Sequence, residues 1–231
     1  TPTTLKDEAL VAELQNTEWD VFVVAAYGKL IPKNILDIPR KGSLNVHPSL
    51  LPKFRGPSPV MSAILADERT TGVSIMEVVE QMDAGPVVAQ ARIEIAPEDW
   101  PPKGSVLEDM LALEGGNLLA EIMPEWVAGK ITPEPQDETL ATYTHKFTDE
   151  DAKIDLHDAP HKNLLKIRAF DKNPRGYFLD NGNPSTGLRA RRVIVTEAEV
   201  HEGKLEILKV VPEGKKEMSY LEFSRNGAKQ V

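Results

Sequence analysis

Two short runs of apolar, mostly β-branched residues constrain the fold more than any other feature of this chain. The first, "DVFVVAAYG" (20–28), is continuous and ends in Gly, which is typical of a strand buried on both faces of a parallel sheet. A stripe at helical spacing precedes it in "LKDEALVAELQN" (5–16), and a second strand, "GSLNVH" (42–47), follows it. This alternation predicts an α/β sheet.

Further elements extend the same unit. Pro59 is expected to open a helix through "VMSAILADE", while "TGVSIMEVV" (71–79) and "VVAQARIEI" (87–95) predict two more strands. A long helix is expected from Ser105, where Ser105-x-x-Glu108 matches a capping box. Within this helix, Gly115-Gly116 predicts a break or a kink, and Pro124 predicts a restart.

The amino-acid composition of the chain changes after residue 130. Residues 131–155 are rich in acids and contain Pro133 and Pro135, which favours a linker or an ordered crossing strap. A short helix, "APHKNLLKIRAF" (159–170), and alternating runs such as "GKLEILKVV" (203–211) follow, and these predict antiparallel strands. We therefore expect a first domain over 1–130, a linker over 131–155 and a small, mainly β domain over 156–231.

Composition narrows the chemistry. The absence of cysteine excludes disulfides, thiolate nucleophiles and cysteine-based zinc sites. No apolar run reaches the roughly 20 residues that span a bilayer, and the first residues show no signal pattern, so a cytoplasmic location is expected. His157 and His161 have the i, i+4 spacing of zinc ligands, but Pro160 interrupts the helix and no third ligand is evident, so no metal is expected.

The charge of the chain is unevenly distributed. The formal net charge is −9, yet residues 161–192 hold eight Lys and Arg against two Asp, a local +6 that leaves −15 elsewhere. Such a segment is either a solvated face or a surface for a polyanion.

Asn45 and His47 are the first candidates for chemistry. A strand that runs into "NVHPSLLP" delivers both side chains, two residues apart, to the carboxyl end of the sheet and in the same direction. An amide can donate to a developing oxyanion and an imidazole titrates near neutral pH, which suits acyl transfer. The alternative for an isolated pair of this kind is structural: Asn45 caps a turn, and His47 forms a hydrogen bond with a backbone carbonyl.

Asp83, in "MDAGP", is the third candidate. A carboxylate beside His47 would orient the ring, raise its pKa and prepare it for proton transfer, and Gly85 permits a tight loop beside a ligand. The alternative for Asp83 alone is an Asx turn before glycine.

"SLNVHPSLLPKFRGPSPV" followed by "TGVSIMEVVEQMDAGPVVAQ" resembles the formyltransferases that use 10-formyltetrahydrofolate. Within that family, "PQDETLATYTHK", "KIRAFDKNPRGYF" and "PEGKKEMSYLEF" are similar to the methionyl-tRNA formyltransferases. The resemblance implies a mostly parallel, Rossmann-like sheet with helices, truncated at its N-terminus, and a small OB-like, mainly β C-terminal domain.

The resemblance also assigns residues. Its catalytic trio falls on Asn45, His47 and Asp83. The expected folate contacts are Tyr27, Gly28, Leu30, Ile31, Ser49, Leu50, Leu51, Pro52 and Gly85. The expected contacts to tRNA are Arg55, Gly56, Lys166, Arg168, Arg175, Arg189, Arg191 and Arg192.

The implied activity is transfer of a formyl group from 10-formyltetrahydrofolate, a co-substrate, to the α-amino group of initiator methionyl-tRNA. One alternative is a folate-dependent N-formyltransferase that acts on a sugar nucleotide or a ribonucleotide amine. Another is a remnant that binds folate or tRNA without turnover.

The start of the chain carries a further expectation. Family members are expected to have roughly 60 residues, with the opening strands of the sheet, ahead of Thr1. The sequence is then either part of a longer product or naturally reduced. The run "VFVVAAY" would have a partly unpaired edge, which predicts self-association through that edge.

Overall fold

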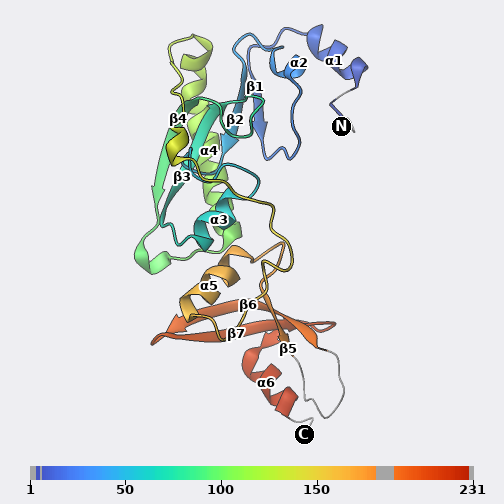
Figure 1. The fold of residues 1–231 in the computed structure, drawn as a ribbon, viewed down its shortest axis with the longest axis vertical. Coiled ribbons are helices and arrows are strands. Elements are labelled where there is room, and N and C mark those ends of the chain that lie inside the picture. Colours follow the sequence, from blue (N-terminus) through green and yellow to red (C-terminus); the bar gives the residue numbers. More distant parts are fainter. Residues whose placement is uncertain (1–3, 6, 181–189, 229–231) are drawn as a thin grey trace. The chain divides into compact units, whose positions relative to one another are not determined.

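The computed structural model describes the chain except residues 1–3, 6, 181–189 and 229–231 (Figure 1). The chain divides into two compact units, one of residues 1–59, 70–95 and 108–145 and the other of residues 60–69, 96–107 and 146–231. The segment 131–155, which composition marks as a linker, is shared: 131–145 belongs to the first unit and 146–155 to the second. None of the described helices has the length and apolar character needed to cross a membrane.

The first unit contains a four-stranded sheet in the order β1-β2-β3-β4. Its strands are β1 (Phe22–Ala25), β2 (Ser43–His47), β3 (Thr70–Glu77) and β4 (Val87–Glu94), so all four predicted strands are confirmed. Only β1 and β2 run parallel, since β2–β3 and β3–β4 are antiparallel pairs. The sheet is therefore mixed rather than mostly parallel.

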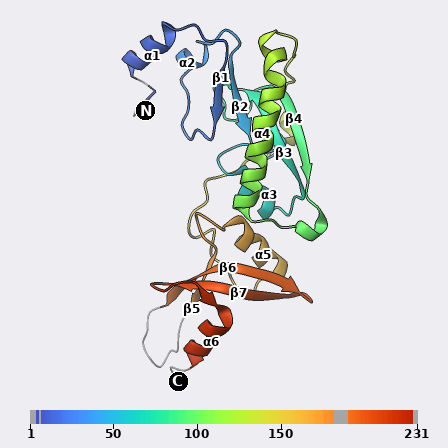
Figure 2. The ribbon, with the colours of Figure 1, turned by 180° about the vertical axis from the view of Figure 1, so that it is seen from behind.

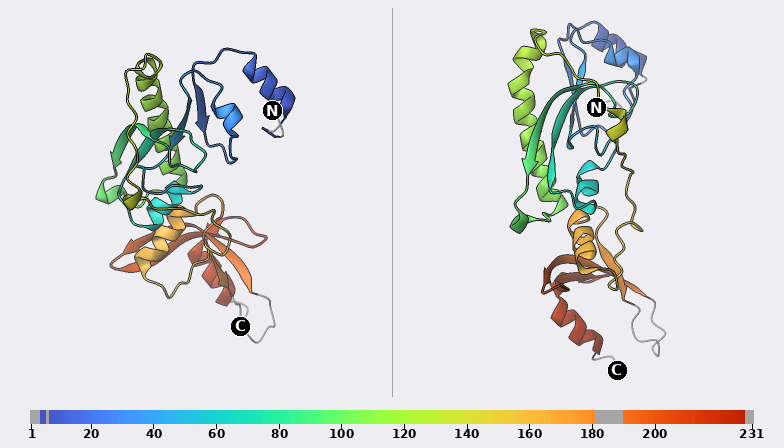
Figure 3. Two further views of the ribbon diagram at one scale, coloured as in Figure 1. Left: turned by 45° about the horizontal axis from the view of Figure 1, so that its top comes forward. Right: turned by 60° about the vertical axis from the view of Figure 1, so that its left-hand side comes forward.

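Strand β1 lies at the edge of this sheet (Figure 3). Its residues alternate between half-buried and exposed, and Val23 is 49% exposed. The prediction of a strand buried on both faces is therefore wrong for this strand, because β2 is its one neighbour among the described strands and side chains alternate across a sheet.

Helix α4 (Gly104–Val127) lies along one face of the sheet (Figure 2). It is continuous, so the predicted break at Gly115-Gly116 and restart at Pro124 are wrong. Gly115 is a packing residue: a Cβ there would lie 2.6 Å from Cγ1 of Val46 and 3.1 Å from Cγ2 of Val73. The missing side chain lets the helix approach β2 and β3 closely. Leu44, Ile75 and Trp126 form the buried core between the two.

The first turn of α4 is also capped differently from the prediction. The carboxylate of Asp171 accepts hydrogen bonds from the backbone N–H of Ser105, at 3.0 Å, and from its hydroxyl. Ser105 is thus bonded to a residue 66 positions later in the chain, in place of the expected reciprocal pair with Glu108.

Two shorter helices, α1 (Glu8–Gln15) and α2 (Lys33–Leu36), belong to the first unit. A third, α3 (Pro59–Leu65), follows β2 in the chain and belongs, apart from Pro59, to the second unit. The Asp7 side chain caps α1 by accepting from the N–H of Ala9 at 2.9 Å. Pro59 begins α3, as its place in the sequence predicts.

The second unit is a small antiparallel sheet with helices, which confirms the expected mainly β domain. Strands β5 (Tyr177–Asp180), β6 (Arg191–His201), β7 (Lys204–Pro212) and β8 (Met218–Ser219) pair in chain order. Helices α5 (Pro160–Ala169) and α6 (Tyr220–Ala228) lie on opposite sides of this sheet (Figures 1 and 2). The core consists of Ile154, Leu164, Ile167, Phe178, Val193, Val195, Ala198 and Val210.

Candidate active site

Strand β2 positions the amide and the imidazole. Val46 packs against Gly115 of α4, so the alternation of side chains sends Asn45 and His47 to the face of the sheet away from that helix. Asn45 is half-buried, and its amide has no hydrogen-bond partner within the described part of the chain. Strands β1 and β2 run parallel, as predicted, and Ala25 at the end of β1 lies opposite Val46. The loop that leaves β1 therefore begins beside Asn45 and His47.

The His47 ring is held by two neighbours. Its Nε2 lies 3.0 Å from the carbonyl oxygen of Phe54, and because a carbonyl can only accept, Nε2 carries the proton. Its Nδ1 lies 3.7 Å from Oδ2 of Asp83. In the neutral ring Nδ1 therefore carries a lone pair on the side of the carboxylate.

Burial controls the protonation of this histidine. His47 is 4% exposed, and desolvation lowers its pKa below the usual value, while the Asp83 charge and the bond to Phe54 act in the opposite direction. Asp83 thus raises the pKa of His47, as expected, but the opposite effect of burial is larger. A neutral His47 at pH 7, with a free acceptor at Nδ1, is the state that can take up a proton.

Asp83 reaches His47 from the loop between β3 and β4. Its Oδ2 also accepts from the backbone N–H of Gly56 at 2.7 Å. Asp83 has φ +51°, in the left-handed region that Asp tolerates better than most residues. Two residues on, a Cβ at Gly85 would lie 1.8 Å from the carbonyl oxygen of Glu77, so only glycine lets the loop approach the end of β3.

The loop after β2 is tied to the sheet by two polar side chains. The Ser74 hydroxyl donates to the carbonyl of Ser49 at 2.6 Å and accepts from the N–H of Leu51 at 3.0 Å. The Gln90 amide donates to the carbonyl of Leu51 at 2.9 Å and to the Ser74 hydroxyl at 2.8 Å. These bonds fix the path of the chain that follows His47.

Arg55 lies inside the protein. Its side chain is fully buried, and its guanidinium donates to the Gln136 carbonyl and to both carboxylate oxygens of Glu138 at 2.8–3.0 Å. The bond to Glu138 raises the pKa of Arg55. A tRNA phosphate could reach this guanidinium only after these bonds had broken, so the structure gives Arg55 an internal role in place of the predicted surface contact. Gly56 lies beside it, with φ +111°.

Eight of the nine residues predicted to contact folate lie in two loops of the first unit, and Gly85 lies in a third, between β3 and β4. In the loop after β1, Tyr27 is 43% and Leu30 72% exposed, and a Cβ at Gly28 would have no atom within 4 Å. In the loop after β2, the side chains of Ser49 and Leu51 are buried, so this loop offers a ligand its backbone. Ile31 is half-buried in the first loop, and Leu50 and Pro52 are half-buried in the second.

Most of the predicted tRNA-binding cations in the second unit have local partners. The Lys166 ammonium donates to the carbonyl of Lys153 at 2.8 Å, and Arg168 donates to the carbonyl of Ala198 at 3.3 Å. Arg191 pairs with Asp180 at 3.1 Å. Arg192 pairs with Asp149 at 3.0 Å and lies over the Tyr177 ring at 3.9 Å from its centre. Arg175 is half-buried, and Arg189 lies outside the described residues.

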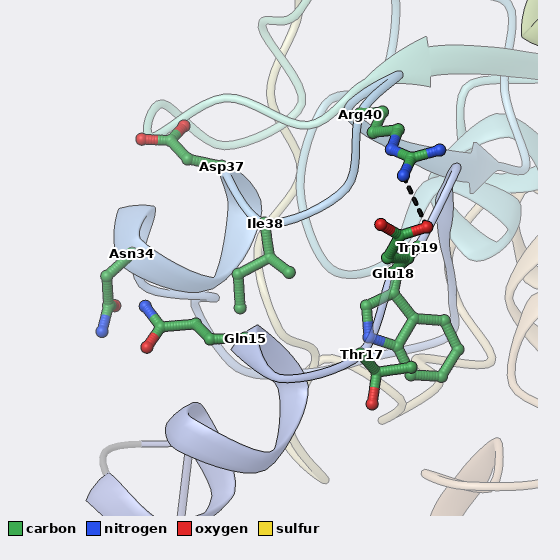
Figure 4. Close-up of a pocket in the computed structure, with 8 residues that line it drawn as sticks. All are labelled: Gln15, Thr17, Glu18, Trp19, Asn34, Asp37, Ile38 and Arg40. Carbon is green, nitrogen blue, oxygen red and sulfur yellow. Dashed lines mark ion pairs between the residues drawn. The ribbon is translucent and has the colours of Figure 1, made fainter.

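Sequence reasoning missed Gln136, which donates to the backbone carbonyls of Asp83 at 2.9 Å and Gly85 at 2.7 Å. A second feature it missed is a shallow groove lined by Gln15, Thr17, Glu18, Trp19, Asn34, Asp37, Ile38 and Arg40 (Figure 4). None of the predicted site residues lines this groove. Among the described residues, no group of three or more His, Asp or Glu side chains could hold a metal ion.

The fold and this site define a formyl transferase: the family model described as formyl transferase matches residues 1–119, and the chain belongs to this family. Its relatives place it with the methionyl-tRNA formyltransferases. The enzyme of that name from Dictyoglomus thermophilum is 39% identical over 223 residues, which cover 88% of this chain and 70% of the relative. The one from Herpetosiphon aurantiacus is 36% identical and covers 100% of this chain and 79% of its own length.

For some relatives the match covers a smaller share of their length. A methionyl-tRNA formyltransferase from Roseiflexus castenholzii is 41% identical, but the chain spans only 60% of its length. Among solved structures, the methionyl-tRNA formyltransferase from Clostridium thermocellum matches 95% of this chain and 85% of its own, with a TM-score of 0.65 at 17% identity. HypX from Aquifex aeolicus, in complex with tetrahydrofolic acid, matches 99% of this chain and 42% of its own, with a TM-score of 0.73 at 18% identity. These two likenesses show the formyltransferase fold.

Proposed function

We propose that this chain transfers the formyl group of 10-formyltetrahydrofolate to the α-amino group of initiator methionyl-tRNA and so supports translation initiation. The observation that carries the proposal is the convergence of Asn45, His47 and Asp83 at the carboxyl end of β2. The names of the relatives support the choice of donor and acceptor.

The reaction needs an oxyanion stabiliser and a proton acceptor. The neutral amine attacks the formyl carbon, a C–N bond forms, and the bond between that carbon and N10 of the folate then breaks. One proton leaves the amine and one is gained by N10. The unpartnered Asn45 amide suits the oxyanion, and Nδ1 of His47 suits the proton.

Asp83 has a supporting role in this scheme. Its carboxylate lies on the Nδ1 side of His47, so it favours the imidazolium that forms when Nδ1 takes up the proton. Because the Nε2–H of His47 is bonded to Phe54, the ring has no second donor for the oxyanion while it is neutral. We therefore assign the oxyanion to Asn45.

The folate would contact the loop after β1. Tyr27 and Leu30 are exposed there and the space beside Gly28 is open, which fits a flat, aromatic ligand read by backbone groups. The loop that contains Leu50 to Pro52 would complete this contact through its backbone. The carbonyls of Ser49, Leu50, Leu51, Pro52 and Gly85 all accept hydrogen bonds from within the protein, and Pro52 has no N–H, so the backbone N–H of Leu50 is the first group to test.

The tRNA would contact the second unit and the segment around Gly56. Arg175 and the exposed Lys172 have no acidic partner among the described residues, whereas Arg191 and Arg192 would have to exchange Asp180 and Asp149 for phosphates. Phosphate contacts of this kind weaken steeply with salt. Affinity for tRNA that does not change with salt would contradict this assignment.

The direct test incubates the chain with 10-formyltetrahydrofolate and methionyl-tRNA and follows the formylated ester by mass spectrometry. Asn45→Ala, His47→Ala and Asp83→Asn should each lower the rate by about 10²-fold or more. His201→Ala removes an exposed histidine from the end of β6 and should leave the rate unchanged. Equal loss in all four variants would reject the assignment of roles.

The two alternatives have their own outcomes in the same assay. Turnover with an amino sugar nucleotide or a ribonucleotide amine, but not with methionyl-tRNA, would make the chain a different N-formyltransferase. Binding of folate or tRNA without turnover on any amine would make it a binding remnant.

Self-association through β1 is a separate part of the proposal. The strand lies at the edge of the sheet formed by the described strands, and its Val23 is half exposed. An unpaired edge of this kind can pair with a second copy. Light scattering that shows a monomer at micromolar concentration would contradict it.

A further inference from the structure

The side-chain nitrogen and oxygen of Gln136 both form hydrogen bonds within the first unit. Its Nε2 donates to the carbonyls of Asp83 and Gly85, and its Oε1 accepts from Nε of Arg55 at 3.0 Å and from Nη2 of Arg55 at 2.8 Å. An amide has two donors and one acceptor oxygen, so all of its hydrogen-bonding groups are used. Gln136 thus joins the loop that holds Asp83 to the buried arginine.

Arg55 is fixed independently of this contact. Its guanidinium is bound by the carboxylate of Glu138, and its backbone N–H and C=O bond to Thr142 at 2.9 Å and to Thr144 at 2.7 Å. Two residues before Gln136, Glu134 makes a pair of backbone hydrogen bonds with Val87 at 2.8 Å each. The segment 134–144, which we call the strap, is therefore anchored on both sides of Gln136.

The two carbonyls that Gln136 binds belong to Asp83 itself and to Gly85, so Gln136 fixes the backbone directly after the Asp83 side chain. Asp83 lies at φ +51°, a conformation that costs roughly 1 kcal/mol for a residue other than glycine. Its carboxylate must at once reach the N–H of Gly56 and stay 3.7 Å from Nδ1 of His47. Both contacts depend on the direction in which this backbone points.

We propose that Gln136 is a positioning residue for the Asp83–His47 pair and that Arg55 holds Gln136 in the orientation this requires. The strap would then complete the site, although no hydrogen bond joins it to Asn45 or His47 in the described part of the chain. The expected effect of Gln136 on catalysis rests on the proposed formyl transfer. The expected effect of Gln136 on the titration of His47 does not depend on that function.

Two substitutions of Gln136 distinguish a role in positioning Asp83 from a role in anchoring Arg55. Gln136→Met is close in shape and loses every hydrogen bond of the amide. Gln136→Glu keeps an oxygen acceptor for Arg55 but loses both donors to the carbonyls of Asp83 and Gly85. Glu134→Gln, in the same strap, is the matched control, because its exposed side chain makes no contact with the site.

If Gln136 positions Asp83, both Gln136 variants should lower kcat by about 10- to 100-fold, with KM values close to wild type. In Gln136→Met, which adds no charge, His47 should titrate at lower pH by NMR, because the Asp83 carboxylate that favours its protonation is no longer held beside it. Glu134→Gln should match the wild type in both measurements.

Wild-type kcat in Gln136→Glu would overturn the proposal, since Gln136 would then serve only to anchor Arg55. An unchanged His47 titration in folded Gln136→Met would overturn it as well. If the wild-type chain shows no turnover with any amine, the proposed function fails, yet the titration of His47 still decides whether Gln136 positions Asp83.

Discussion

Gly115 and Gly116 are adjacent in α4, and we predict that replacing each with alanine changes stability in opposite directions. An alanine is favoured over glycine by about 1 kcal/mol in a helix interior. At Gly116, which is exposed, a Cβ would have no atom within 4 Å, so Gly116→Ala should gain that amount.

At Gly115 the same gain is opposed by a steric cost. The new Cβ would meet methyl groups of Val46 at 2.6 Å and Val73 at 3.1 Å, and valine side chains in strands have little freedom to turn away. Overpacking of this kind costs typically 1–3 kcal/mol. The net effect of Gly115→Ala should be a loss of stability of up to about 2 kcal/mol.

Urea unfolding followed by tryptophan fluorescence measures both changes. Trp126 is the useful reporter because it belongs to α4, packs in the core with Leu44 and Ile75 of the sheet, and is 7% exposed. A double variant, Gly115→Ala with Gly116→Ala, should lie near the wild type. If both single variants stabilise the protein, the close contact between α4 and the sheet is not what Gly115 provides, and our account of the continuous helix fails.

Three further predictions concern charged groups. Asp83→Asn should lower the pKa of His47 further, since the carboxylate that raises it is lost, and an upward shift by NMR would contradict the assignment. Arg55→Met should destabilise the first unit by about 2–3 kcal/mol in urea, because charge-assisted bonds to the strap are lost, whereas Arg40→Met, at an exposed pair, should change it little. Burial raises the pKa of Asp67, but hydrogen bonds from Trp100 and His161 outweigh this effect and hold the pKa below its usual 3.8. The stabilisation that Asp67 provides is therefore complete at neutral pH and is lost as the pH falls below 3.8 and through the lower pKa of the folded state. Asp67→Asn should narrow the difference in the free energy of unfolding between pH 7 and pH 3.

Local pattern was sufficient for most elements of this fold. Runs such as "SLNVH" and "TGVSIME" carry the β-branched and apolar residues that strands favour, and Pro59 marks a helix start. The direction of β3 relative to β2 is set by how the connection crosses the sheet, which no local pattern encodes. For the same reason Gly115 was misread: a glycine that breaks a helix and one that lets a helix touch a sheet look alike in sequence.

Some residues of the site could be identified from the sequence and others could not. Asn45 and His47 could be identified because their spacing alone directs both side chains to one side of a strand. Gln136 could not, because its partners Asp83 and Arg55 lie 53 and 81 residues earlier in the chain. The internal partners of Arg191 and Arg192 were hidden for the same reason, and a count of charges cannot distinguish a paired arginine from one available to a polyanion.

The anchored strap has a practical consequence for anyone who trims this protein. Composition suggests cutting near residue 130, which would retain Asn45, His47 and Asp83 in the shorter piece. That piece would lack the backbone partner of Val87 and would leave the Arg55 guanidinium without Gln136 or Glu138 to receive its hydrogen bonds. An expression boundary for the first unit therefore belongs after His145, beyond the last residue of that unit.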